Sequence, residues 1–153
     1  MENKIRGDEI VEGIRIAKEY MENNNLKMVV NKDGEIVAKS TDRGIKPIYD
    51  VYVEQFEKLK GAFVADRITG KAAAMLLAQG EISGIYTDLI SEPAVEIFDK
   101  KGINIQYMKR VPHILNRDKD GMCPIETISR NVGNVDELIE GIEEFFVIVG
   151  MKK

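Results

Sequence analysis

The 153-residue chain has one cysteine, one histidine and no long apolar run. A single cysteine cannot form an internal disulfide, which is consistent with a reducing cytosol. The most apolar stretch, residues 145–149, is far too short to cross a bilayer, and the first residues lack the apolar core of a signal peptide. We therefore expect a soluble, cytoplasmic protein with no membrane partner.

The chain also lacks an excess of positive charge, because 22 Lys and Arg residues stand against 26 Asp and Glu residues, a net charge of -4. Nucleic acids favour basic patches, so we expect no nucleic-acid partner. The content of 44% hydrophobic and 31% charged residues is ordinary for a globular protein. No repeat, low-complexity tract or linker is present, and we predict a single domain over residues 1–153.

The first part of the chain has clear patterns of secondary structure. Apolar residues at helical spacing predict a helix over residues 8–22. Two strands, residues 26–30 and 35–38, flank an Asp-Gly dipeptide that favours a hairpin turn. A second helix, over residues 47–60, begins with proline and has one apolar stripe.

The rest of the chain alternates between strand and helix patterns. We expect strands over residues 62–65, 82–89, 103–108 and 111–115, and helices over residues 69–79, 91–101, 123–130 and 134–149. The end of the last segment is rich enough in β-branched residues to be a strand instead. This order predicts an α/β fold with a mixed sheet, and such sheets usually bind ligands beyond the carboxyl ends of parallel strands.

Polar residues concentrate where helices are expected to begin. Helix starts present unpaired N–H groups and a partial positive charge, so several around one crevice would bind an anion or a nucleotide. In the first of them, Thr69 is a plausible N-cap, Gly70 lets a ligand approach the backbone and Lys71 adds a charge. The longer glycine-rich loop of a P-loop is missing. Alternatively, Gly70 permits tight packing and Lys71 is solvated.

The second of these helix starts follows an expected core strand. Ser91 is a candidate cap or ligand-binding residue, and Glu92 is a candidate acid, base or hydroxyl acceptor. The alternative is that both residue types are simply favoured in a first helical turn. Asp66 either pairs with Arg67 or orients a group in the site.

Cys123 begins another expected helix and is a candidate nucleophile, because a helix start favours the thiolate. A lone cysteine is, however, most often a small buried apolar residue. Asn116 with Arg117, and Arg43 with Lys46, are candidates to hold a phosphate or carboxylate. Solvated turns explain these four residues equally well.

Taken together, these segments resemble the prokaryotic "domain of unknown function 1893" family, whose members are similar to the cytidine deaminase fold. The matching segments are Arg43-Gly44-Ile45-Lys46-Pro47, Asp66-Arg67 with Gly70-Lys71-Ala72-Ala73-Ala74, Ile90-Ser91-Glu92-Pro93-Ala94, Asn116-Arg117 and Cys123-Pro124. The resemblance implies a three-layer α/β/α domain with a mixed central sheet. It also implies a crevice where the helices starting at Gly70 and Ser91 meet.

Zinc deaminases carry a His-x-Glu motif on the first of these helices and a Pro-Cys-x-x-Cys motif on the second. The corresponding stretches here, residues 69–71 and 91–94, contain neither histidine nor cysteine. The single His and the single Cys lie elsewhere, and they cannot supply three protein ligands for a catalytic zinc. We therefore expect no metal, no cofactor and no zinc-dependent deamination.

Three functions remain open on the sequence. The first is a zinc-independent enzyme for a nucleotide or another small anionic metabolite, with Cys123, Glu92 and Asp66 as catalytic candidates. The second is a non-catalytic ligand-binding or regulatory module. The third is an oligomeric interaction protein, for which a homodimer through the C-terminal apolar helix is one model. The concentration of polar residues at helix starts favours the first two without separating them.

Overall fold

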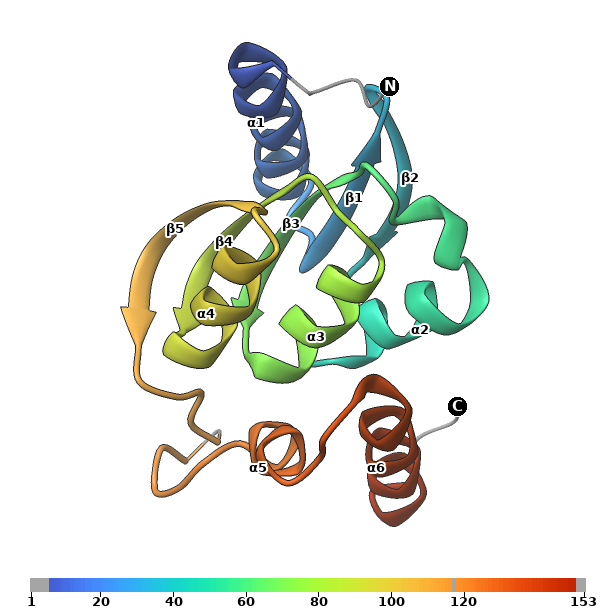
Figure 1. Cartoon of the computed structure of the whole chain (residues 1–153), viewed down its shortest axis with the longest axis vertical. Coiled ribbons are helices and arrows are strands. Elements are labelled where there is room, and N and C mark those ends of the chain that lie inside the picture. Colours follow the sequence, from blue (N-terminus) through green and yellow to red (C-terminus); the bar gives the residue numbers. More distant parts are fainter. Residues whose placement is uncertain (1–5, 117, 151–153) are drawn as a thin grey trace.

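The computed structural model describes residues 6–116 and 118–150 (Figure 1). The chain forms a helix and a β-hairpin, then a helical segment, then strands and helices in alternation, and finally two helices. The elements are α1 (Gly7–Asn23), β1 (Met28–Lys32), β2 (Glu35–Ser40), α2 (Lys46–Glu54), the 3-10 turn η1 (Phe56–Lys58), β3 (Phe63–Thr69), α3 (Lys71–Gln79), β4 (Gly84–Ser91), α4 (Glu92–Lys100), β5 (Asn104–Val111), α5 (Pro124–Arg130) and α6 (Val135–Ile148).

The strands form one five-stranded sheet in the order β2-β1-β3-β4-β5. Neighbours β2, β1 and β3 are antiparallel, whereas β3, β4 and β5 run parallel. The β1–β2 turn has positive φ angles at both Asp33 (55°) and Gly34 (83°). Those angles are required by a tight type I′ turn, and an Asp-Gly dipeptide adopts them at low cost. The mixed sheet predicted from the sequence is confirmed.

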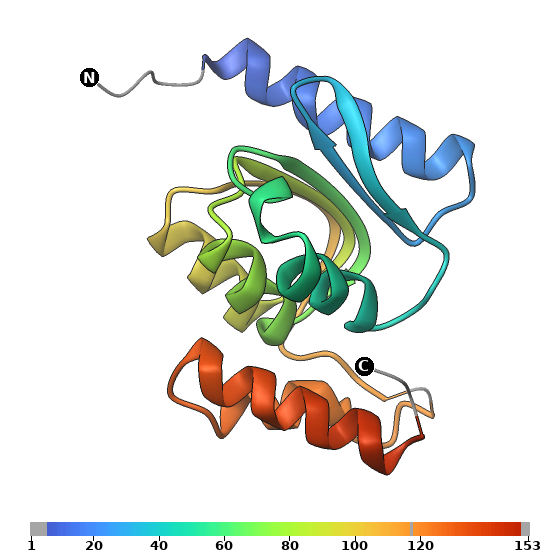
Figure 2. The same ribbon diagram turned by 90° about the vertical axis from the view of Figure 1, so that its right-hand side faces the viewer.

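Helices cover both faces of the sheet, as the three-layer prediction requires (Figure 2). Helix α1 packs on β1, β3 and β4 from one side, while α2, α3 and α4 lie on the other. Helices α5 and α6 contact α3 and lie across one end of the molecule. Each face has its own core, centred on Ile14, Met21 and Phe63 under α1 and on Leu76 and Phe98 opposite.

Several element boundaries differ from the predictions. The helix expected to reach Lys60 ends at Glu54, because Gln55 leaves the helical region with φ -142°. Residues 111–115 do not form a separate strand, since Leu115 makes only an isolated bridge to Met122. The last segment is helical as far as Ile148, which decides against a terminal strand. None of the helices in the described part of the chain is both long and apolar enough to cross a membrane.

Candidate functional site

The two helix starts singled out in the sequence lie at one edge of the sheet. Strands β3 and β4 are parallel neighbours, and their last residues, Thr69 and Ser91, come directly before the loop or helix that follows. Helices α3 and α4 then return side by side over the same face. The α5–α6 pair lies beyond this edge of the sheet (Figure 1).

An internal carboxylate already occupies the start of α3. The Lys71 amide donates to Glu126 Oε1 at 3.1 Å, and the Ile114 amide donates to Glu126 Oε2 at 2.6 Å. Glu126 is only 2% exposed. A methyl group on Gly70 would come within 3.2 Å of Glu126 and 3.1 Å of the Ile114 side chain. The amide expected to be unpaired therefore has an anionic partner from α5, and Gly70 faces protein.

Sequence reasoning did not assign Glu126 to this role. The residue lies three positions after Cys123, which is the N-cap of α5. A glutamate at that position is usually explained by the capping of its own helix. Its contact with α3 joins residues 55 positions apart, and no local pattern reports such a contact.

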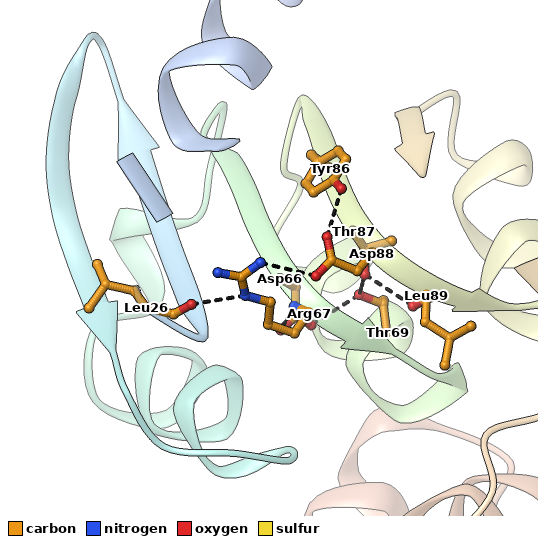
Figure 3. A network of polar contacts seen from close by, with 8 residues as sticks. All are labelled: Leu26, Asp66, Arg67, Thr69, Tyr86, Thr87, Asp88 and Leu89. Atoms are coloured by element: carbon orange, nitrogen blue, oxygen red, sulfur yellow. Dashed lines mark hydrogen bonds and ion pairs between the residues drawn. The ribbon is translucent and has the colours of Figure 1, made fainter. Parts of the chain in front are cut away.

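Thr69 is the last residue of β3 rather than the N-cap of α3, which corrects the sequence prediction. Gly70 holds the N-cap position and provides no side-chain cap. Thr69 is fully buried, and its hydroxyl donates to Asp66 Oδ2 at 3.0 Å (Figure 3). The same hydroxyl lies within hydrogen-bond distance of Thr87 Oγ1, at 2.9 Å. In turn, Thr87 Oγ1 donates to the Leu89 carbonyl at 3.1 Å.

The network shows that β3 is locally irregular. Residues three positions apart in a regular strand point to opposite faces, yet Asp66 and Thr69 are hydrogen-bonded through their side chains. The ladder between β3 and β4 pairs Asp66 with Thr87 and Ile68 with Leu89. The pair that would lie between them, Arg67 with Asp88, is missing from the ladder. This distortion turns the Thr69 side chain toward the buried side chains of Asp66 and Thr87. A ligand would have no access to its hydroxyl there.

Asp66 does not form the ion pair with its neighbour that was one interpretation of the sequence. Arg67 donates instead to Asp88 Oδ2 at 3.1 Å and to the Leu26 carbonyl at 3.0 Å (Figure 3). Burial raises the pKa of Asp66 to about 7, and hydrogen bonds from Thr69 and from the Arg67 amide offset part of that rise. Asp66 is thus a carboxyl group held inside the fold.

Ser91 and Glu92 serve the structure of α4. The fully buried Ser91 hydroxyl accepts from the Ala94 amide at 3.3 Å, so it is the N-cap that the sequence predicted. Glu92 Oε2 accepts from Arg110 Nε on β5 at 2.7 Å. This hydrogen bond lowers the pKa of Glu92, and the side chain is engaged at the exposed β5 edge.

Cys123 also lies apart from these groups. Cys123 is partly exposed at the N-cap of α5, and its backbone amide donates to the Ile114 carbonyl at 2.9 Å. The Asp66 network is inside the sheet and Glu92 faces β5. The three residues proposed as catalytic therefore belong to three different environments.

The remaining predicted ligand-binding residues are dispersed. Asn116 holds its own turn, with Nδ2 donating to Asp120 Oδ1 at 2.8 Å. Lys46 pairs with Asp50 one turn along α2 at 2.8 Å. Arg43 is exposed in the loop before α2. Arg117 lies outside the described residues.

Lys71 is the predicted residue that lines an open cavity. Its side chain borders a hollow of about 440 Å³ between α3, α4 and the end of α5, together with Lys100 and Arg130. We call this space the cationic hollow; its lining also includes Pro93, Glu96 and Ile97. Among the residues that the structure describes, none of these three cations forms an ion pair.

Lys100 and Arg130 were not singled out in the sequence, because each belongs to the last turn of its helix, where basic residues are common.

The family model described as TM1506, Domain of unknown function (DUF1893), matches residues 16–146. The chain belongs to the DUF1893 family. A crystal structure of a DUF1893 family protein (TM1506) from Thermotoga maritima is similar to it with a TM-score of 0.79 and 25% identity, and the match covers 95% of each chain.

Two structures of RibD from Acinetobacter baumannii, forms 1 and 2, match this DUF1893 chain with TM-scores of 0.43. Their identities are 13% and 14%, and the matches cover 65% and 86% of this chain. The chain spans 33% and 37% of the length of these RibD chains. No curated protein shows significant similarity to the sequence.

The helix starts of this DUF1893 protein do not fit a catalytic zinc ion. Gly70 has no side chain and the Lys71 amide is bonded to Glu126, while Ser91 caps α4 and Glu92 pairs with Arg110. Within residues 6–116 and 118–150, no three His, Cys, Asp or Glu side chains gather as a metal-ligating group would.

Proposed function

We propose that this DUF1893 protein binds a small anionic metabolite, such as a phosphate ester, in the cationic hollow. The observation that carries the proposal is the convergence of Lys71, Lys100 and Arg130, one from each of α3, α4 and α5, on a single cavity. Among the residues that the structure describes, Glu96 is the one carboxylate in its lining, so this lining has an excess of positive charge. That excess contrasts with the net charge of -4 of the whole chain.

The chemistry of these side chains suits a phosphate or a carboxylate. The Arg130 guanidinium can donate two parallel hydrogen bonds, while Lys71 and Lys100 act as compact charges. An anion in the hollow would also reduce the mutual repulsion of the three cations. Because Glu126 occupies the Lys71 amide, the ligand would be held by side chains instead of the helix start that the sequence suggested.

We assign binding without a reaction. The lining of the cationic hollow does not include Cys123, Glu92 or Asp66, the three catalytic candidates. A reacting group must lie within hydrogen-bond reach of the substrate, directly or through one water. The arrangement therefore favours the ligand-binding module over the zinc-independent enzyme.

Titration calorimetry with inorganic pyrophosphate at low ionic strength tests this proposal. We expect measurable binding to the intact chain that weakens about tenfold in Lys71→Ala and in Arg130→Gln, because each change removes a charge-assisted contact. Binding should also weaken as salt is added.

A matched control is Lys60→Ala. Lys60 is exposed and comes before the amino end of β3, whereas Lys71 follows its carboxyl end, so both changes remove the same charge at opposite ends of one strand. We expect pyrophosphate to bind this variant as it binds the original chain. Equal affinity in all variants, or no binding to the original chain, would reject the cationic hollow as an anion site.

A further inference from the structure

A second hollow adjoins the cationic one and has a different character. It has a volume of about 290 Å³ and shares Lys71 and Ile97 with its neighbour. Its remaining lining is mainly apolar, so we call it the apolar hollow. The apolar side chains that line it are Met75, Ala78, Ile97, Val132 and Val135.

The shared residues arise from the regular spacing of two helices. Lys71, Met75 and Gln79 follow each other at four-residue steps, which places them along one side of α3. Ile97 on α4 and Lys101, the C-cap of that helix, have the same spacing and line the same hollow. The two hollows adjoin at Lys71 and Ile97, and we call them together the groove; its lining also includes Val132, Gly133 and Val135, which lie at the junction of α5 and α6.

The two sections of this groove differ in polarity. Three cations line the first section, the cationic hollow, whereas apolar side chains dominate the second, the apolar hollow, which Lys71, Gln79 and Lys101 also line. The step from Lys71 to Gln79 is eight residues, which is about 12 Å along an α-helix. A free phosphate would occupy only the first section.

We propose that the groove binds a nucleoside 5′-monophosphate, with the phosphate in the cationic hollow and the base in the apolar hollow. This inference rests on the proposed anion binding and specifies the class of ligand. The flat face of a base would cover Met75 and Ile97, and the Gln79 amide offers both a donor and an acceptor to its edge. A simple alkyl phosphate would leave Gln79 and Lys101 without partners from the ligand.

Calorimetric titration of the intact chain with AMP, CMP and ribose 5-phosphate tests the assignment. We expect both nucleotides to bind about tenfold more tightly than ribose 5-phosphate, because the base removes apolar surface from water. Met75→Gln keeps the length of the side chain but makes it polar. In that variant we expect the advantage of the nucleotides to fall to about twofold or less, with the affinity for ribose 5-phosphate unchanged.

Val132→Ser changes the opposite wall of the apolar hollow and should reduce the nucleotide advantage in the same way, which provides a test if Met75→Gln does not fold. Lys71→Ala should weaken all three ligands alike. If neither nucleotide binds more tightly than ribose 5-phosphate, the base site is rejected while anion binding stands. If no phosphate compound binds at all, both proposals are rejected.

Discussion

Asp66 is a carboxyl group buried within the sheet whose hydrogen-bond partners include two hydroxyl groups in series. In its protonated form, its O–H can donate to Thr69, which donates to Thr87, which donates to the Leu89 carbonyl. Every hydroxyl then has one acceptor. The ionised form must instead take a hydrogen bond from Thr69 while its charge stays out of water. Burial favours the neutral carboxyl, while the hydrogen bonds from Thr69 and from the Arg67 amide favour the ionised form and offset part of that preference.

The pH dependence of stability follows from that preference. The pKa of Asp66 is raised from 3.8 to about 7 in the folded protein, so the folded state holds the proton more tightly than the unfolded state. Stability from this group is fully present below about pH 4 and is lost as the pH rises to 7. The free energy of unfolding falls by at most about 4 kcal/mol over this range, because a shift of one pKa unit corresponds to about 1.36 kcal/mol.

Asp66→Asn should remove this dependence, because an amide stays neutral and can donate to Thr69 as the protonated carboxyl does. Urea unfolding should show the variant close to the original chain at pH 4.5 and more stable at pH 8. The control is Asp99→Asn, which changes an exposed carboxylate on α4 and should leave the pH dependence of stability as it is in the original chain. A variant that is less stable at pH 8, with an unchanged slope, would contradict the neutral carboxyl.

The Asp66–Arg67 pair illustrates the limit of sequence reasoning at this scale. Adjacent charges suggest an ion pair, but successive side chains of a strand point to opposite faces. Arg67 consequently pairs with Asp88 on the neighbouring strand, where Tyr86 also donates to Asp88 at 2.6 Å. The partner depends on which strand lies alongside, and that is not written in the local sequence.

At the scale of elements, α1 shows how far periodicity reaches. The expected apolar stripe is confirmed, since Ile14, Ala17 and Met21 are each at most 1% exposed. Periodicity did not indicate the role of Gly13, which is also buried on this helix. A methyl group there would overlap the ring of Phe63 on β3, so the glycine lets α1 lie close to the sheet.

Gly13→Ala should therefore destabilise the protein. Alanine favours a helix interior over glycine by about 0.5–1 kcal/mol, but overpacking against a core ring costs about 1–3 kcal/mol. We expect the overpacking to dominate and the midpoint of urea unfolding to fall. Gly7→Ala, at the open first residue of α1, provides the comparison and should change stability little. A gain in stability for Gly13→Ala would show that Phe63 moves aside easily.

At the scale of the whole molecule, Glu126 joins the α5–α6 pair to the rest of the fold. Its two oxygens accept from the Lys71 amide at the start of α3 and from the Ile114 amide after β5. The carboxylate also lies at the positive end of the α3 dipole. Docking of α5 thus provides an acceptor for two backbone amides, and it positions Arg130 beside the cationic hollow.

Glu126→Gln should lower the free energy of unfolding by about 2–3 kcal/mol, because the amide NH₂ would meet a backbone N–H donor at one of the two positions. Urea unfolding measures the loss, and hydrogen exchange should show faster exchange at the Lys71 and Ile114 amides. Glu140→Gln, exposed on α6, should change stability by no more than about 0.5 kcal/mol. Equal effects of the two changes would show that the Glu126 bridge contributes little.

Local chemistry determined much of this protein from the sequence alone. The order of helices and strands, the Asp33-Gly34 turn and the caps at Ser91 and Asn134 all follow from interactions within a few residues. Tertiary structure alone decided that the start of α3 would receive Glu126 and that cations of three separate helices would meet in one hollow. Such contacts join residues far apart in the chain, and their geometry exists only once the helices have packed on the sheet.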